Sequence, residues 1–185
     1  MTNSHFWWYL SRASGIVSWA LLSASVLWGI FLATRMLKPF DRPAWLLDLH
    51  RWLGALTIFG VALHLVALFA DSYVKFSVAD LVVPFMSSWR PVAVALGVVA
   101  MYLLVIVQVS SLMIKRLPKK IWRAIHFSSY AMFVFVMLHS FLAGSDRGKT
   151  LFISIAAILV LFTGISTIQR VKYKLNPKRK ALFQS

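Results

Sequence analysis

The chain has 185 residues, of which 60% are hydrophobic and 14% charged, and it contains eight Trp and fourteen Phe. This composition excludes an ordinary soluble domain and predicts an integral membrane protein, while the lack of cysteine excludes disulfides, thiolate metal sites and iron–sulfur clusters. The net charge of +15 does not indicate nucleic acid binding, because the basic residues lie at the ends of apolar segments, as in membrane proteins.

Five apolar segments are long enough to cross about 30 Å of hydrocarbon. They are residues 15–34, 46–70, 92–114, 121–143 and 151–168. The predicted fold class is therefore all-α, a bundle of five transmembrane helices. Most of the basic residues follow the first, third and fifth segments, so the positive-inside rule predicts an external N-terminus and a cytoplasmic C-terminus.

The N-terminal region carries the aromatic cluster His5-Phe-Trp-Trp-Tyr9, which is typical of the lipid headgroup level. We expect His5 to be an interfacial residue and not a ligand. The first apolar segment lacks a basic leader and a convincing cleavage site, so it is expected to be a retained helix and not a signal peptide. Its many Gly, Ala and Ser residues predict close packing on neighbouring helices, which leaves space for a flat ligand elsewhere in the bundle.

The second helix is predicted to start at Asp41-Arg-Pro43, with the aspartate as cap and the proline in the first turn. It carries two histidines, His50 and His64. The loop that follows, residues 71–90, is the longest connection on the outer side. Its pattern of apolar residues around an aspartate predicts a short segment lying on the outer surface.

The fourth helix is predicted to start after Leu117-Pro118, and it also carries two histidines, His126 and His139. The third and fifth helices have no histidine, and we assign no chemistry to their few polar residues, which usually form hydrogen bonds between or within helices. Residues 171–185 form a basic tail, which we expect to bind anionic lipid on the cytoplasmic side. Docking of an acidic cytosolic reductase is the alternative for this tail.

The four intramembrane histidines form two pairs of matched depth. The second and fourth helices run in the same direction, so His50 matches His126 near the cytoplasmic face and His64 matches His139 near the outer face, with the two levels about 20 Å apart. An imidazole inside a bilayer is costly unless its ring nitrogens are occupied. A lone histidine is usually a satisfied polar residue, but two level pairs predict metal or haem ligation between facing helices.

Haem suits this pattern best, because iron porphyrin takes two axial imidazoles, and bis-histidine ligation favours electron transfer over oxygen binding. A zinc or di-iron carboxylate site would need more ligands at one depth.

The histidine spacing in the fourth helix does not match that in the second. The spacing of fourteen residues places His50 and His64 on one face, whereas the spacing of thirteen leaves His126 and His139 about 140° apart on an ideal helix.

Haem propionates need cationic partners, and arginine forks suit carboxylates. The leading candidates are Arg51 and Arg123 near the inner pair and Arg12 near the outer pair. Further candidates at these levels are Arg35, Arg116, Arg90 and Arg147. For most of these residues, the alternative is a topology determinant at the headgroup level.

Two sequence stretches resemble the ferric-reductase-like transmembrane domain superfamily. They are Leu49-His-Arg-Trp-Leu-Gly54 followed by His64, and Leu117-Pro-Lys-Lys-Ile-Trp-Arg-Ala-Ile-His126 followed by His139. The superfamily includes NADPH oxidases, ferric reductases and the haem-binding membrane partner of periplasmic methionine sulfoxide reductase. Two shorter motifs are similar to those of stand-alone bacterial members of the superfamily. They are Ser11-Arg-Ala-Ser-Gly15 and Pro84-Phe-Met-Ser-Ser-Trp-Arg-Pro91. The resemblance covers roughly residues 9–170.

The resemblance implies a haem-binding transmembrane domain over residues 1–170, followed by the tail, in a multi-pass protein of the bacterial plasma membrane. It implies two b-type haems, the inner one ligated by His50 and His126 and the outer one by His64 and His139. Residues 172–185 are far too short for a flavin and NADPH domain. We therefore expect FMN, FAD or quinone to act only through a partner, a separate flavoprotein reductase or quinol as donor, and we assign no catalytic residue.

Three functions are compatible with these expectations. The first is an oxidoreductase or electron-transfer subunit that carries electrons to an external acceptor such as ferric iron, oxygen or a periplasmic redox protein. The second is a cytochrome b subunit that exchanges electrons with the quinone pool. The third is a haem-free membrane scaffold, for which a missing Soret band would be the sign.

Overall fold

The computed structural model describes residues 4–34 and 42–175. Its elements are α1 (Ser4–Thr34), α2 (Pro43–Ala70), α3 (Val78–Val82), α4 (Pro91–Leu112), α5 (Lys119–Ala143) and α6 (Thr150–Leu175). All of them except α3 are long and apolar enough to span a membrane. The predicted all-α bundle of five transmembrane helices is confirmed.

Prolines mark the start of α2 and α5. Helix α2 begins at Pro43, with Arg42 as an extended N-cap that makes no side-chain hydrogen bond; the predicted cap, Asp41, lies outside the described residues. Helix α5 begins directly after Pro118, as predicted. Helix α1 begins at Ser4, well before the predicted residue 15, because the interfacial aromatic cluster continues the helix instead of preceding it.

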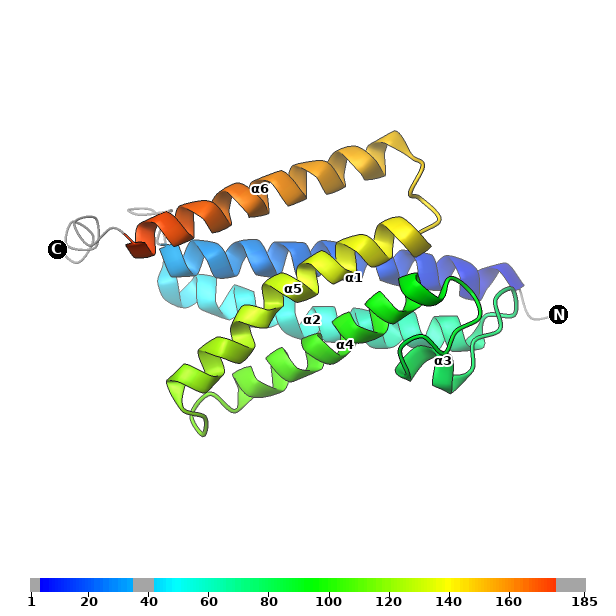
Figure 1. Cartoon of the computed structure of the whole chain (residues 1–185), viewed down its shortest axis with the longest axis horizontal. Helices are drawn as coiled ribbons and strands as arrows, with labels where there is room; N and C mark the ends of the chain where they lie inside the picture. The colour runs from blue at the N-terminus through cyan, green and yellow to red at the C-terminus, as the bar shows by residue number, and fades with distance from the viewer. Residues whose placement is uncertain (1–3, 35–41, 176–185) are drawn as a thin grey trace.

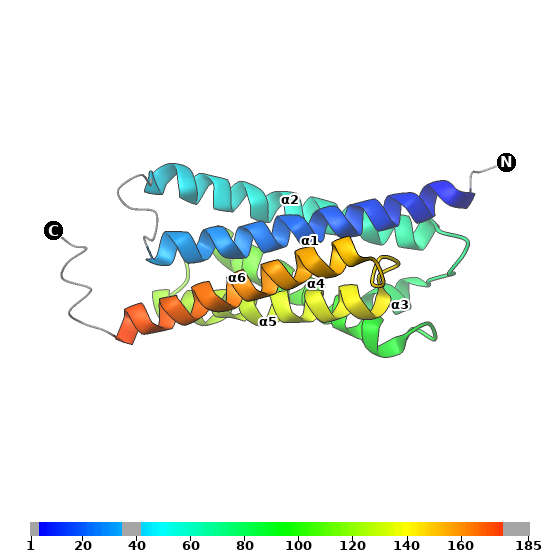
Figure 2. The ribbon, with the colours of Figure 1, turned by 90° about the horizontal axis from the view of Figure 1, so that it is seen from above.

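The bundle is built from two closely packed helix pairs, α1 with α2 and α4 with α5, and α6 packs against α1 (Figures 1 and 2). The chain ends point to opposite ends of the bundle, with α3 at the N-terminal end. Contact between α1 and α2 is tight, since a Cβ at Gly60 of α2 would lie 2.5 Å from Oγ of Ser18 on α1. The small residues of α1 therefore allow the close packing that the sequence predicts.

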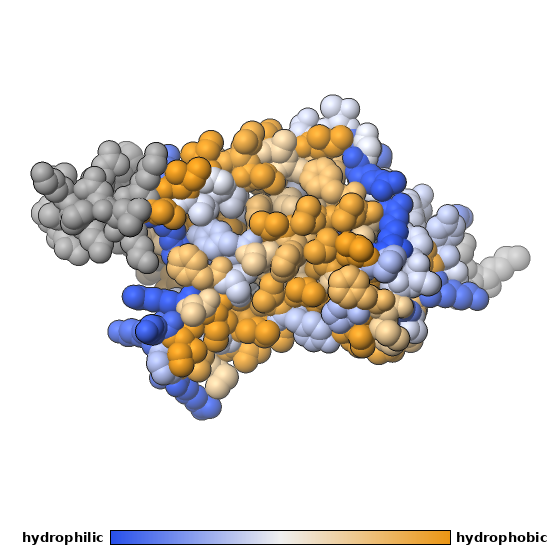
Figure 3. Space-filling view, viewed as in Figure 1, coloured by the Kyte–Doolittle hydropathy of each residue, from blue (hydrophilic) through white to orange (hydrophobic). Residues whose placement is uncertain are grey.

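The core joins the two pairs near the middle of the bundle. Trp19 and Ile30 of α1 are buried together with Met132, Phe133 and Met137 of α5, and the indole Nε1 of Trp19 donates to Sδ of Met137 over 3.1 Å. Outside this core, the helices expose their apolar side chains, among which Phe59 is 68% exposed. Figure 3 shows a broad hydrophobic band across the molecule, with most hydrophilic residues at its two ends. Such a band fits lipid contact, as expected of a multi-pass membrane protein.

The loop between α2 and α4 packs on the first half of α4. Helix α3 starts with a capping box, in which Ser77 and Asp80 exchange side-chain and backbone hydrogen bonds. Leu81 is buried in a small cluster with residues of α4, and the hydroxyl of Tyr102 on α4 donates to the carbonyl of Val82 over 2.6 Å. The short surface segment expected within residues 71–90 is present.

Candidate functional site

The structure brings the four predicted histidines together at two levels. At one level, the rings of His50 on α2 and His126 on α5 have centroids 6.0 Å apart and planes inclined by 69°. At the other level, His64 and His139 both line one cavity of about 510 Å³. All four side chains are half-buried. His50 and His126 thus lie near each other, and His64 and His139 share the lining of one cavity.

Helices α2 and α5 are not among the helix pairs that pack against each other in the described part of the chain. Each packs instead on an outer neighbour, α2 on α1 and α5 on α4. The histidines therefore project into a space between two helix pairs, which is where a flat group held from both sides would have to lie.

Three of the imidazoles are held by backbone carbonyls of the neighbouring helix. Nδ1 of His64 lies 2.7 Å from the carbonyl oxygen of Ser11, Nδ1 of His50 lies 3.0 Å from that of Ser25, and Nδ1 of His139 lies 2.7 Å from that of Ala93. A carbonyl oxygen can only accept, so each Nδ1 carries the hydrogen. This tautomer leaves the lone pair of Nε2 free, as a metal-binding imidazole needs.

His126 is held differently. Its Nδ1 lies 3.4 Å from the hydroxyl of Ser111, which itself donates to the carbonyl of Val107 over 2.7 Å. The ring also stacks on Trp122, with centroids 5.0 Å apart and planes inclined by 27°. The spacing of thirteen residues along α5 is thus accompanied by different approaches of His126 and His139 to α4.

Glycines lie beside the three carbonyl-bound rings. A Cβ at Gly15 would lie 3.1 Å from Cε1 of His64, and one at Gly29 would lie 3.3 Å from Cε1 of His50. At Gly97, a Cβ would lie 2.8 Å from both Cε1 and Nδ1 of His139. These glycines allow each imidazole to lie directly against the backbone of the adjacent helix. From the sequence, the small residues of the first segment were interpreted only as packing residues, and Gly97 was not singled out.

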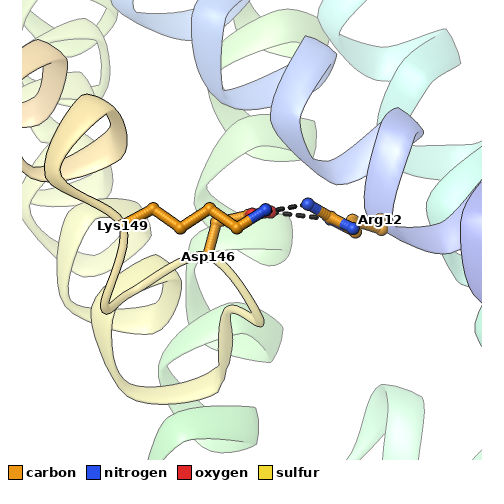
Figure 4. A network of polar contacts seen from close by, with 3 residues as sticks. All are labelled: Arg12, Asp146 and Lys149. Atoms are coloured by element: carbon orange, nitrogen blue, oxygen red, sulfur yellow. Dashed lines mark hydrogen bonds and ion pairs between the residues drawn. The ribbon is translucent and has the colours of Figure 1, made fainter.

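The cavity at His64 and His139, called the outer cavity after the orientation predicted from the sequence, has a size typical of cofactor sites, which span roughly 300–1,000 Å³. Two residues that line it, Arg12 and Asp146, form an ion pair. Nε and Nη2 of Arg12 donate to Asp146 over 2.7 and 2.5 Å, and Nζ of Lys149 lies 2.9 Å from the same carboxylate (Figure 4). The hydrogen bond from Arg12, and then that from Lys149, lowers the pKa of the Asp146 carboxyl. This network ties α1 to the loop between α5 and α6.

The predicted arginines have different surroundings. Arg12 lines the outer cavity, as do Arg90 and Arg147, and Arg90 donates to the carbonyl of Leu142 over 2.6 Å. Arg51 is exposed and lies 3.3 Å from Asp48 in an ion pair. Two more candidates, Arg116 and Arg123, are also exposed, and Arg35 lies outside the described residues.

Three polar groups near His50 and His126 were not predicted from the sequence. Arg170 of α6, read as part of the basic group after the last helix, donates to the hydroxyl of Tyr130 over 2.6 Å and lies close enough to act electrostatically on His126. The indole Nε1 atoms of Trp28 and Trp122 are buried and have no hydrogen-bond partner among the described residues. The only sequence signal for a role of these tryptophans was their position, since Trp28 precedes Gly29 and Trp122 lies one helical turn before His126.

A model of the family described as ferric reductase like transmembrane component matches residues 14–137. The match extends from α1 into α5 and includes His50, His64 and His126, while His139 follows shortly after its end. No curated protein and no solved structure matches the chain.

Proposed function

Because the chain belongs to the ferric reductase-like transmembrane family, we propose that it is a di-haem b cytochrome that carries electrons across a membrane. Family membership itself indicates a membrane protein with a role in redox chemistry or electron transfer. The di-haem proposal rests on one observation. Imidazoles from α2 and α5 lie between two helix pairs, and each Nδ1 has a hydrogen-bond contact with a residue of α1 or α4.

The residues at both levels fit a bis-imidazole haem. Two imidazole–metal bonds of about 2 Å each put ring centroids roughly 6 Å apart, close to the 6.0 Å between His50 and His126. At the outer level, the cavity between His64 and His139 supplies the space for a flat ligand. Bound there, haem would supply reversible one-electron chemistry, since two imidazoles fill both axial positions of the iron.

Charged and polar groups near each level would hold the haem carboxylates. Arg12 is the leading candidate outside, because it already lies at the cavity. Inside, the indole of Trp122, which has no hydrogen-bond partner among the described residues, stacks on His126, and Arg170 lies within electrostatic reach of the same imidazole. Arg51 and Arg123 would have to turn inward from exposed positions to take part.

The direction of transfer follows from the distribution of basic residues. The positive-inside rule favours a cytoplasmic C-terminus in a bacterial plasma membrane, so electrons would pass from a cytoplasmic donor to an external acceptor. The donor would be a separate flavoprotein reductase or quinol. The acceptor would be ferric iron, oxygen or a periplasmic redox protein.

Haem content of the purified protein tests the proposal. We expect two haems b per chain and a low-spin spectrum in the dithionite-reduced minus oxidised difference. The variant His64→Ala should lose one haem, whereas His5→Ala is the matched control because His5 is an exposed histidine of α1. Two haems in His64→Ala would refute the pairing, and a missing Soret band in the wild type would favour a haem-free scaffold.

Direction can be measured in sealed vesicles of known protein orientation. Reductant enclosed on the side of the C-terminus should reduce an impermeable ferric chelate on the other side, and His64→Ala should abolish this transfer. Reduction of quinone in place of the external chelate would instead support an exchange with the quinone pool.

A further inference from the structure

The residues that contact the histidines recur at intervals of fourteen along α1. The outer contact consists of the Ser11 carbonyl and Gly15, and the inner contact consists of the Ser25 carbonyl and Gly29. In both, the glycine follows the carbonyl residue by four positions, one helical turn. Fourteen residues make nearly four turns, so the two contacts lie on one face of α1, opposite His64 and His50.

Helix α4 has the same repeat, but its second copy differs. The outer contact is again a carbonyl, that of Ala93, followed four residues later by Gly97. Fourteen residues further along, the equivalent positions are Val107 and Ser111. A serine therefore stands where the other three contacts have a glycine.

The serine changes how the imidazole reaches the backbone. A side chain at the glycine position keeps a ring away from the helix, as the 2.8 Å approach of a Cβ at Gly97 to His139 indicates. The hydroxyl of Ser111 has one hydrogen and donates it to the Val107 carbonyl over 2.7 Å. Toward Nδ1 of His126, at 3.4 Å, this oxygen can then only accept.

We propose that Ser111 is a positioning residue that makes the inner haem differ from the outer one, an inference that rests on the proposed function. A strong acceptor at Nδ1 makes an imidazole a more basic ligand and so favours ferric over ferrous iron. The outer Nδ1 atoms lie 2.7 Å from their carbonyls. The inner contacts are longer: Nδ1 of His50 lies 3.0 Å from the carbonyl and 3.3 Å from the hydroxyl of Ser25, and Nδ1 of His126 lies 3.4 Å from the hydroxyl of Ser111. The inner haem therefore has the less basic imidazole ligands and the higher reduction potential.

The repeat offers a reciprocal test with two substitutions. Ser111→Gly lets His126 approach the Val107 carbonyl directly and should lower the potential of the inner haem. Gly97→Ser gives His139 a hydroxyl partner and should raise that of the outer haem. One hydrogen bond changes an equilibrium by roughly tenfold, which for a one-electron couple is about 59 mV.

Each potential must be assigned to one haem. Spectroelectrochemical titration of Ser111→Gly in a His64→Ala background reports the inner haem alone, and Gly97→Ser in a His50→Ala background reports the outer haem alone. Ser111→Thr keeps the hydroxyl and should retain the wild-type inner potential. Ser111→Ala keeps the Cβ, leaves Nδ1 without an acceptor and should raise the inner potential further.

The outcomes separate the two proposals. A wild type with no haem, or with one, refutes the proposed function. Two haems with an inner potential that Ser111→Gly and Ser111→Ala leave unchanged overturn the role of Ser111 alone. If Ser111→Gly does not retain haem, the reciprocal Gly97→Ser variant decides, because an unchanged or lowered outer potential contradicts the inference.

Discussion

The glycine contacts make a graded prediction about haem binding. Substitution by alanine adds one Cβ, which would lie 2.8 Å from Cε1 and Nδ1 of His139 at Gly97 and 3.1 and 3.2 Å from the same atoms of His64 at Gly15. At Gly29, the distances to Cε1 and Nδ1 of His50 are 3.3 and 3.7 Å. Optimal carbon contacts are about 3.5–4.0 Å, so the required ring movement decreases from Gly97 to Gly15 to Gly29.

Movement of the ring has a cost because Nδ1 is bound. A displacement of roughly 1 Å, which a normal carbon contact requires, would break the 2.7 Å hydrogen bond between His139 and the Ala93 carbonyl. A buried donor left unpaired costs about 1–3 kcal/mol, and about 1.4 kcal/mol is a tenfold loss of affinity. We therefore expect Gly97→Ala to weaken outer haem binding about tenfold or more, Gly15→Ala less, and Gly29→Ala to have little effect on the inner haem.

The assay is the haem-to-protein ratio after dilution, measured beside helicity. Gly164→Ala in α6 is the matched control, since a Cβ there meets nothing within 4 Å and alanine should stabilise a helix by up to about 1 kcal/mol. Gly97→Ser should retain more outer haem than Gly97→Ala, because the hydroxyl offers the displaced ring a new acceptor. Equal haem retention in Gly97→Ala and Gly164→Ala would refute the reasoning.

Three further predictions concern other parts of the chain. Because the pKa of Asp146 is lowered in the folded protein, its ion pair with Arg12 stabilises above the ordinary aspartate pKa of about 3.9 and ceases to do so as pH falls through the lower folded value. Asp146→Asn should thus lower the thermal midpoint at pH 7, with a loss of about 1–2 kcal/mol, and the difference from wild type should vanish in acid melts. Trp122→Phe keeps an aromatic ring beside His126 but removes the buried N–H; if this N–H holds the cofactor, inner haem should dissociate faster in a haem-transfer assay, and an unchanged rate would contradict that role. Ser77→Ala removes the α3 cap and should cost about 1 kcal/mol in denaturant melts without changing haem content.

The sequence predicted the helices and the histidine levels because both depend on simple periodicity. A run of apolar residues has to match the bilayer thickness, and a constant rise per residue converts the spacings of His50, His64, His126 and His139 into heights. The start of α1 was placed too late because interfacial residues such as Trp8 lower the hydropathy without ending a helix.

The contacts around the histidines could not be predicted in the same way. Small residues in membrane helices usually mark packing, so Gly15 and Gly29 gave no specific signal until their positions opposite the histidines were visible. The recurrence of glycine after fourteen residues, equal to the spacing of His50 and His64, was the available clue. Arginine roles were less predictable still, because Arg51 and Arg170 both satisfy the positive-inside rule. Only the fold shows that Arg51 is exposed beside Asp48 and that Arg170 lies within electrostatic reach of His126.

The arrangement of helices explains why each level needs two helix pairs. The pair α1–α2 supplies one imidazole with its Nδ1 partner, and the pair α4–α5 supplies the other. Each ring orientation is therefore set by contacts inside its own helix pair. The Trp19–Met137 contact and the Arg12–Asp146 ion pair connect the pairs through protein alone. A ligand that binds both imidazoles of a level would add a third connection, so its binding and the docking of the two pairs must stabilise each other.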